Sequence, residues 1–161
     1  MKKIRTVGSI LRVLRKLKSE GKTIGFTNGC FDILHPGHIE YLENIKRYVD
    51  ILVLGLNSDK SVRKIKGKSR PVVTEIDRAR VLSALEMVDY VVIFDEETPY
   101  ELINVIKPKY LFKGADWKLN EVVGRDIVES YGGKVISIPY LEEYSTTKLL
   151  KKIWKKSFYA S

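Results

Sequence analysis

Five short apolar runs, each followed by an amphipathic stretch, constrain the fold of this chain more than any other feature. They are rich in β-branched residues and comprise Thr23–Thr27, Ile51–Leu56, Tyr90–Phe94, Tyr110–Phe112 and Val135–Ile138. Near-continuous apolarity over so few residues is typical of strands covered on both faces. Strands that alternate with helices form parallel sheets with right-handed crossovers. The sequence therefore predicts an α/β fold, with helices flanking a doubly wound, five-stranded parallel sheet.

Helix boundaries are marked by capping residues and glycines. Pro36 is well placed as a first helical residue, because it has no N–H to leave unpaired there. A first helix with Ile10, Leu14 and Leu17 on one face ends at Gly21, and Gly132-Gly133 ends a later one. The predicted N-caps are Thr74, Thr98 (with Pro99 at the first position), Asn120 and Ser145. Ser58–Val73 holds six basic residues and no clear element, which suggests a mobile lid over phosphates or a solvated loop.

Composition narrows the class of protein and of ligand. The 161 residues suit one domain, with residues 1–21 as an N-terminal helix and 22–157 as the core. A formal net charge of +9 suits a polyanion such as a nucleoside triphosphate, nucleic acid or an acidic membrane, or simply a solvated basic surface. No run approaches the ~18 apolar residues of a membrane span, and the N-terminus does not resemble a signal peptide. With Cys30 as the only cysteine, no internal disulfide can form, which favours a cytoplasmic location.

The segment from Thr27 to His38 is the leading candidate for chemistry. Asn28-Gly29 leaves a predicted strand at its carboxyl end, where open parallel sheets bind ligands. His35 and His38 are three residues apart across the first turn of a helix, so both can face one spot. Free N–H groups at that helix start attract anions, and Gly37 leaves room for one. These features predict a phosphate-binding corner with two imidazoles directed into it.

Two other interpretations of these residues remain open. The histidines could bind a metal, although the chain has only two histidines and one cysteine, too few for a closed zinc site. They could also be structural capping groups. Cys30 has no legible Cys-His-Asn arrangement around it, so a small buried residue fits it better than a nucleophile.

Three further segments carry candidate binding residues. Ser145-Thr146-Thr147 opens the last helix, where hydroxyls and free N–H groups suit phosphate oxygens or a plain N-cap. Lys113-Gly114-Ala115-Asp116-Trp117 follows a strand and could line a base or sugar pocket, or form an ordinary turn. In Asp77-Arg78-Ala79-Arg80, Arg78 could reach a phosphate or form a surface ion pair.

Taken together, the motifs resemble the cytidylyltransferase-like nucleotidyltransferases. The resemblance rests on the run Thr27–Asp32, on His35-Pro36-Gly37-His38 and on the late Ser145-Thr146-Thr147. Within that group, Leu56–Asp59, Lys66–Val72, Leu82–Asp89 and Lys113–Asp116 are most similar to the adenylyltransferases of bacterial ADP-heptose synthesis. The resemblance implies a Rossmann-like fold and a reaction in which a sugar phosphate attacks the α-phosphorus of a nucleoside triphosphate, releasing pyrophosphate.

The resemblance also implies roles for individual residues. His35 and His38 would stabilise the transition state, Lys66 would neutralise developing charge, and Mg²⁺ would arrive with the triphosphate rather than in a protein metal site. Residues expected to bind the acceptor are Asp32, Asn57 and Arg70. Residues expected to bind the nucleotide, besides His38, are Thr27, Asn28, Gly29, Cys30, Phe31, Gly37, Arg78, Lys113, Gly114, Asp116, Ser145, Thr146 and Thr147.

Substrates and partners follow from the same resemblance. We expect ATP and a heptose 1-phosphate as substrates, a homodimer, no nucleic acid or membrane partner, and action without the fused kinase half that some heptose enzymes carry. The alternatives are an enzyme that uses CTP and glycerol 3-phosphate, and a basic nucleic-acid-binding module suggested by Lys151–Lys156. The sequence departs from the family in one place, since Glu142-Glu143-Tyr144 stands where a glycine usually precedes the Ser-Thr-Thr segment.

Overall fold

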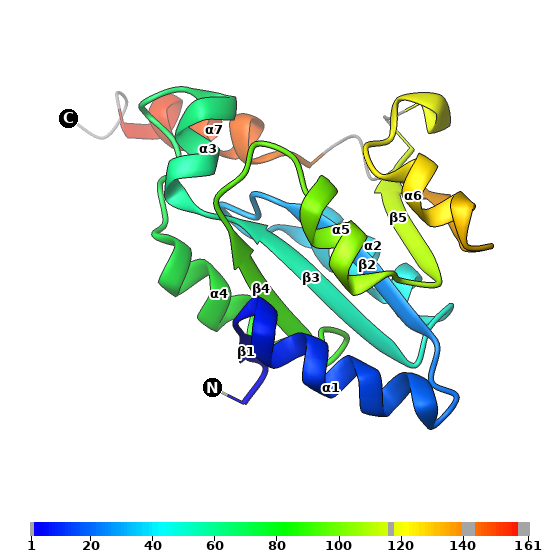
Figure 1. Cartoon of the computed structure of the whole chain (residues 1–161). Helices are drawn as coiled ribbons and strands as arrows, with labels where there is room; N and C mark the ends of the chain where they lie inside the picture. The colour runs from blue at the N-terminus through cyan, green and yellow to red at the C-terminus, as the bar shows by residue number, and fades with distance from the viewer. Residues whose placement is uncertain (1, 116–117, 140–143, 158–161) are drawn as a thin grey trace.

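Parallel pairing joins six strands into one sheet (Figure 1). The computed structural model describes residues 2–115, 118–139 and 144–157. Its strands are β1 (Ile4–Arg5), β2 (Ile24–Gly29), β3 (Ile51–Asn57), β4 (Tyr90–Phe94), β5 (Tyr110–Gly114) and β6 (Lys134–Ile138). They follow the spatial order β1-β4-β3-β2-β5-β6. All the carboxyl ends therefore lie at one edge, with β2 between β3 and β5.

The predicted parallel α/β sheet is confirmed, but it has six strands rather than five. The five apolar runs correspond to β2 through β6. The additional strand, β1, is two residues long and pairs with β4 through Ile4–Val91 and Arg5–Val92. Two residues are too few to show a periodicity, so this edge strand left no pattern in the sequence.

Helices cover both faces of the sheet, which is why its strands are apolar on both sides. The α-helices are α1 (Val7–Ser19), α2 (Pro36–Lys46), α3 (Asp59–Lys66), α4 (Glu75–Ala84), α5 (Tyr100–Ile106), α6 (Arg125–Ser130) and α7 (Thr146–Ser157). One core cluster packs α1, α5 and α6 against the sheet, and the other packs α2 and α4 against the opposite face. None of the described helices is long and apolar enough to cross a membrane.

Most predicted helix starts are confirmed by the hydrogen bonds that define them. Pro36 is the first residue of α2, with His35 as its N-cap. The Thr74 hydroxyl accepts from the N–H of Asp77 at 3.3 Å, and the Ser145 hydroxyl accepts from that of Lys148 at 3.1 Å. At Thr98-Pro99, α5 begins one residue later than predicted, at Tyr100.

The predicted cap at Asn120 is wrong. This residue lies inside a short 3₁₀ helix, η1 (Leu119–Glu121), and α6 begins at Arg125. Gly124 precedes α6 with a φ of 86°, a left-handed conformation that glycine adopts without steric cost. The side-chain cap expected from Asn120 is therefore replaced by a backbone turn.

The basic segment Ser58–Val73 is more regular than its composition suggested. Its first half forms α3, whose first turn is capped by the Ser58 hydroxyl accepting from the N–H of Ser61 at 3.2 Å. Within this helix Ser61 and Val62 are buried, while its four basic residues are exposed. Because so few residues of this helix are buried and most of its other residues are lysines and arginines, its sequence shows no clear helical pattern of apolar residues. The helix ends at Gly67, which has a φ of 92°.

Candidate active site

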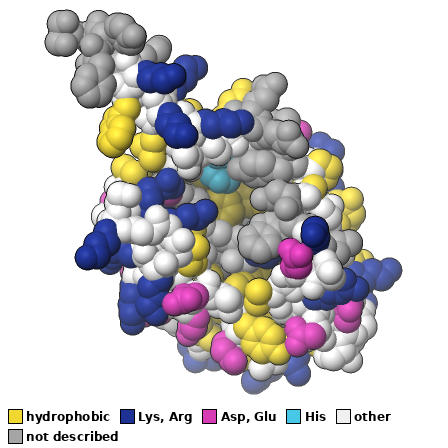
Figure 2. Space-filling model, turned by 90° about the horizontal axis from the view of Figure 1, so that it is seen from above, with side chains coloured by type: hydrophobic (Ala, Val, Ile, Leu, Met, Phe, Trp, Pro, Cys, Tyr) yellow, Lys and Arg dark blue, Asp and Glu magenta, His cyan; other side chains and the backbone are white. Residues whose placement is uncertain are grey.

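A cavity of about 650 Å³ opens at the carboxyl edge of the sheet. Figure 2 looks onto this face, where a histidine lies in a hollow with Lys and Arg side chains nearby. The described residues that line it come from the ends of β2 to β5, from α2 and the start of α7, and from the segments after α3 and before α6, together with the end of α3. They are Asn28, Gly29, Cys30, Phe31, Asp32, His35, His38, Tyr41, Asn57, Ile65, Lys66, Arg70, Glu97, Thr98, Pro99, Lys113, Gly114, Val123, Ser145, Thr146 and Thr147.

The two histidines stack at the start of α2. Their ring centroids lie 3.7 Å apart with an interplanar angle of 19°. The Phe31 ring packs against His38 at 5.1 Å, and Phe31 itself has a φ of 43°, which is rare for a residue with a side chain. Such local strain persists only where packing holds it, and it is common at ligand sites.

Both imidazoles are neutral at physiological pH. Burial lowers the pKa of His38 to about 4, and the neighbouring His35 contributes further in the same direction. Burial also lowers the pKa of His35. The Nδ1 atom of His38 is buried and has no hydrogen-bond partner among the described residues. A neutral imidazole can donate a hydrogen bond to a phosphate oxygen, and a bound polyanion would raise its pKa.

Two glycines make room for this arrangement. A Cβ on Gly37 would lie 3.2 Å from the Nδ1 atom of His35 and 3.3 Å from the Cβ atom of Tyr144. A Cβ on Gly29 would lie 2.9 Å from the ring of Phe31. Side chains at these positions would displace the residues that shape the cavity floor.

The start of α7 reaches the start of α2. The Thr146 hydroxyl donates to the carbonyl of Ile33 at 3.4 Å, and the rings of His35 and Tyr144 stack at 6.2 Å. The structure thus brings Ser145, Thr146 and Thr147 to the same cavity as the histidines, as the sequence predicted. Two helix N-termini beside one cavity favour a bound anion.

The end of β5 supplies a cation to the same cavity. The Lys113 ammonium donates to the side-chain oxygen of Asn28, which links β5 to the end of β2. Gly114 follows and also lines the cavity. Asp116 and Trp117, which were expected to continue this wall, lie outside the described residues, as do Glu142 and Glu143.

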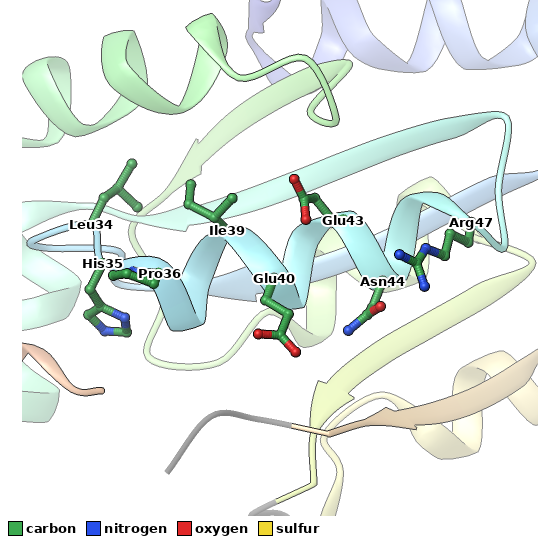
Figure 3. Close-up of a pocket in the computed structure, with 8 residues that line it drawn as sticks. All are labelled: Leu34, His35, Pro36, Ile39, Glu40, Glu43, Asn44 and Arg47. Carbon is green, nitrogen blue, oxygen red and sulfur yellow. The ribbon is translucent and has the colours of Figure 1, made fainter. Parts of the chain in front are cut away.

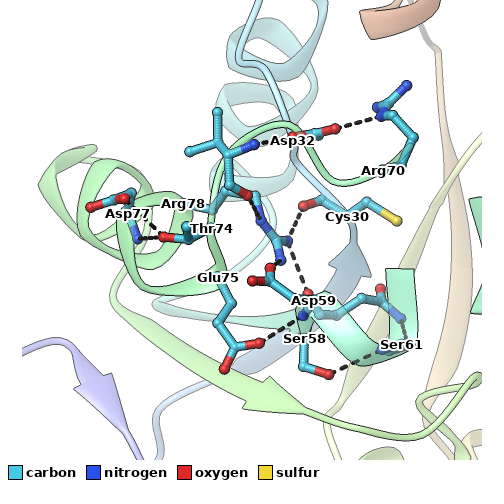
Figure 4. Close-up of polar contacts among 12 residues, drawn as sticks. Cys30, Asp32, Ser58, Asp59, Ser61, Arg70, Thr74, Glu75, Asp77 and Arg78 are labelled. Atoms are coloured by element: carbon cyan, nitrogen blue, oxygen red, sulfur yellow. Dashed lines mark hydrogen bonds and ion pairs between the residues drawn. The ribbon is translucent and has the colours of Figure 1, made fainter. Parts of the chain in front are cut away.

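Asp32 holds the segment after α3 against the end of β2 (Figure 4). Its carboxylate accepts from the N–H groups of Val72 and Val73 at 2.8 and 2.9 Å and from the Arg70 guanidinium. Burial alone would raise the pKa of Asp32, but these hydrogen bonds and the charge of Arg70 lower it below its ordinary value. Asp32 therefore stays ionised and fixes Arg70 at the cavity wall.

Arg78 lies beneath the cavity rather than in its lining. Its guanidinium is fully buried and donates to the carbonyls of Cys30, Asn57 and Val73 and to the carboxylate of Asp59 (Figure 4). The sequence allowed a surface ion pair for Arg78; the ion pair that it forms, with Asp59, instead involves a buried guanidinium. It ties the ends of β2 and β3 to the start of α4.

Two further predicted binding residues also lie behind the lining. The Thr27 hydroxyl is buried 2.8 Å from that of Tyr41, and Gly37 is buried in the first turn of α2. Cys30 reaches the cavity, and burial raises the pKa of its thiol, which fits a packed residue better than a nucleophile.

Six lining residues were not predicted: Tyr41, Ile65, Glu97, Thr98, Pro99 and Val123. Glu97, Thr98 and Pro99 follow the strand β4, so the rule that located the other strand ends could have found them. The sequence predicts only a helix start at Thr98-Pro99 and assigns no role to Glu97. Ile65 and Val123 carry no chemical signal and are brought to the cavity by packing.

A second hollow, of about 800 Å³, lies along the outer side of α2 (Figure 3). It is open, and its labelled carboxylates, Glu40 and Glu43, would repel a phosphate. Among the predicted site residues it contains only His35. The smaller cavity is therefore the better candidate for a polyanionic ligand.

The described residues offer no complete protein metal site. In residues 2–115, 118–139 and 144–157, no three His, Cys, Asp or Glu side chains are grouped so that they could hold a metal ion. A divalent ion that enters this cavity would take most of its ligands from phosphate oxygens and water.

Fold and cavity define an α/β protein whose candidate site, with cationic side chains and two helix starts, lies at the carboxyl edge of a parallel sheet. The cytidylyltransferase-like family model matches residues 26–152, so the chain belongs to that family. Among curated relatives, the bifunctional protein HldE of Geobacter metallireducens is 51% identical over 151 residues, covering 94% of this chain and 31% of the relative. The HldE protein of Wolinella succinogenes is 54% identical over 145 residues, covering 90% of this chain and 30% of the relative. The chain thus spans about a third of these proteins.

Solved structures agree with the fold. The lipopolysaccharide core biosynthesis protein of Thermoplasma volcanium is 30% identical, with a TM-score of 0.63, and the match covers 78% of this chain and 100% of that one. Pantoate-β-alanine ligase of Francisella tularensis, at 16% identity and a TM-score of 0.64, shares the fold; that match covers 95% of this chain and 78% of that one.

Removing the buried guanidinium should destabilise the protein. Arg78→Met leaves three carbonyl groups and Asp59 without their donor, and we expect the free energy of unfolding to fall by about 3 kcal/mol or more. The matched control is Arg80→Met on the exposed side of α4, which should change it by less than about 0.5 kcal/mol. Urea denaturation measures both. Equal stability of the two variants would contradict the structural role of Arg78.

Stability should also fall as the solution is acidified through the range in which free histidine titrates. The unfolded chain binds a proton at His38 near the ordinary pKa of 6.5, whereas the folded protein does so only near 4. The stability due to the neutral ring is therefore complete above about pH 6.5 and is lost as pH falls toward about 4. Denaturation of the wild type and of His38→Gln at about pH 7.5 and about pH 5 tests this. The variant should lose less stability than the wild type; an equal loss would contradict the lowered pKa.

Proposed function

We propose that this chain transfers AMP from ATP to the phosphate of D-glycero-β-D-manno-heptose 1-phosphate, giving ADP-heptose for lipopolysaccharide core synthesis and releasing pyrophosphate. The observation that carries the proposal is the pair of stacked, neutral histidines at the start of α2. They share one cavity with Lys66, Arg70 and Lys113. Such a site suits a transition state in which negative charge is spread over phosphate oxygens.

The chemistry requires alignment more than acid–base catalysis. An oxygen of the acceptor phosphate attacks the α-phosphorus of ATP, and the bond from that phosphorus to the oxygen bridging to the β-phosphorus breaks. Pyrophosphate leaves with the electron pair of that bond. Because an ionised phosphate is already a nucleophile, no strong general base is needed.

Each group of cavity residues has a role in this scheme. His35 and His38 donate hydrogen bonds to the triphosphate as charge develops, and Lys66 approaches from the end of α3 to neutralise that charge. Lys113, Gly114 and the start of α7 hold the nucleotide, and Asn28 and Gly29 approach it by backbone. Asn57 and Arg70 face the acceptor, with Asp32 holding Arg70 in place. Arg78, Thr27 and Gly37 support these positions from behind.

The choice of substrates rests on the motifs and on the relatives. Motifs similar to those of ADP-heptose adenylyltransferases, together with relatives named bifunctional protein HldE and lipopolysaccharide core biosynthesis protein, favour a heptose acceptor and ATP. Mg²⁺ enters as part of the ATP substrate, coordinated mainly by its phosphates. By the same resemblance, residues 22–157 form the catalytic core of a cytoplasmic homodimer.

A substrate panel tests the reaction. Pyrophosphate release should be fastest with ATP and heptose 1-phosphate among combinations of ATP, CTP, GTP and UTP with heptose 1-phosphate and glycerol 3-phosphate. Turnover only with CTP and glycerol 3-phosphate would replace the ATP assignment with a cytidylyltransferase. No pyrophosphate with any pair, together with tight DNA binding that weakens steeply with salt, would instead favour a nucleic-acid-binding module.

Histidine variants test the mechanism. His35→Ala and His38→Ala should each lower kcat by about 100-fold or more, because each removes a donor to the transition state. Circular dichroism should show that the fold is retained. Glu40→Gln, on the outer side of α2, is the control and should leave kcat unchanged within about twofold. A near-wild-type kcat in either histidine variant would remove that residue from the mechanism.

A further inference from the structure

Glu97 is the one carboxylate in the described cavity lining that is not held by buried hydrogen bonds, so its contacts within the protein do not explain why a carboxylate stands there. Among the described residues, the lining contains two carboxylates, Asp32 and Glu97. Asp32 is 1% exposed and is occupied by Arg70 and two backbone N–H groups. The Glu97 side chain is 63% exposed, and its ion pair with Lys64, at 3.6 Å, joins two side chains open to solvent. Pairs of this kind contribute little to stability.

The loop that carries Glu97 is fixed in place by buried hydrogen bonds. The Asn57 amide donates to the Ser61 hydroxyl at 2.9 Å, and that hydroxyl donates to the carbonyl of Glu96 at 2.6 Å. The N–H of Ser58 also donates to the carbonyl of Phe94 at 2.9 Å. Asn57, Ser58 and Ser61 are all buried. The end of β3 and the start of α3 therefore set the position of Glu97 beside the cavity.

The order of the strands divides the cavity into two halves on either side of the histidines. The half beside β5 contains Lys113 and Gly114. The start of α7 lies beside the loop that leads from β2 to α2, where Thr146 donates to the carbonyl of Ile33. The half beside β3 and β4 contains Asn57, Lys66, Arg70 and Glu97. In the proposed function, on which this inference rests, the first half holds the nucleotide and the second holds the acceptor.

A carboxylate is electrostatically unfavourable in a cavity that receives two phosphorylated substrates. It is a strong acceptor, however, for hydrogen bonds from hydroxyl groups. We propose that Glu97 determines acceptor specificity by accepting hydrogen bonds from hydroxyl groups of the acceptor. It thereby selects phosphate esters that carry several hydroxyls, such as sugar phosphates. Lys66 and Arg70, on the same side of the cavity, supply the positive charge for the phosphate of that substrate.

The test compares Glu97→Gln with Glu96→Gln, which removes the same charge from the neighbouring residue outside the described lining. With heptose 1-phosphate as acceptor, E97Q should raise the KM for the acceptor about tenfold and leave the KM for ATP within about twofold. E96Q should change neither KM by more than about twofold. If Glu97 acted only through its charge, E97Q would instead lower the KM for both anionic substrates, and the inference would be overturned.

Deoxy analogues of heptose 1-phosphate identify the hydroxyl that Glu97 contacts. The difference between wild type and E97Q should disappear with the analogue that lacks this hydroxyl and persist with the others. A difference that persists with every analogue would overturn the inference. Wild-type enzyme that turns over heptose 1-phosphate, with equal acceptor KM values for E97Q and E96Q, would overturn the inference alone. Wild-type enzyme that adenylates no hydroxylated phosphate ester would overturn the proposed function and this inference together.

Discussion

The parallel pairing of β2 with both β3 and β5 is the constraint on which the rest of the structure depends. It places the end of β2, and the loop that leads to His35, between the ends of the neighbouring strands. Asn28 and Gly29 thereby lie beside Lys113 on one side and near Asn57 on the other. Arg78 secures this convergence from below, since one buried guanidinium binds carbonyls at the ends of both β2 and β3. The candidate site at the carboxyl edge of the sheet is thus formed by segments that are far apart in the sequence.

The cavity contains two kinds of hydrogen-bond donor: neutral histidines at the start of α2, and cationic side chains from other elements. Burial keeps the stacked histidines neutral, so they cost little electrostatic repulsion at 3.7 Å. The cationic side chains around them are Lys66, Arg70 and Lys113. Neutral donors with cationic side chains nearby can bind a triphosphate, and their hydrogen bonds can become stronger as negative charge develops on the phosphate oxygens in the transition state. The outer side of α2, with Glu40 and Glu43, lacks this arrangement.

The sequence predicted the architecture well because periodicity and capping are local signals. Five of six strands, the start of α2 at Pro36 and the caps at Thr74 and Ser145 follow directly from neighbouring residues. What it could not predict depends on distant partners. The pairing of β1 with β4, the burial of Arg78 and the helix α3 within a basic segment are all decided by packing. Glu97 is different, because it follows the predicted strand Tyr90–Phe94 and the strand-end rule could have located it.

The most direct test of the central claim is a crystal structure of the protein with Mg²⁺ and α,β-methylene ATP, which cannot be cleaved at the reacting bond. The triphosphate should lie within hydrogen-bond distance of His35 and His38, with its β- and γ-phosphates at the start of α7. The half of the cavity that contains Arg70 and Glu97 should remain open for the acceptor. A triphosphate bound along the outer side of α2, or bound away from both histidines, would contradict the account.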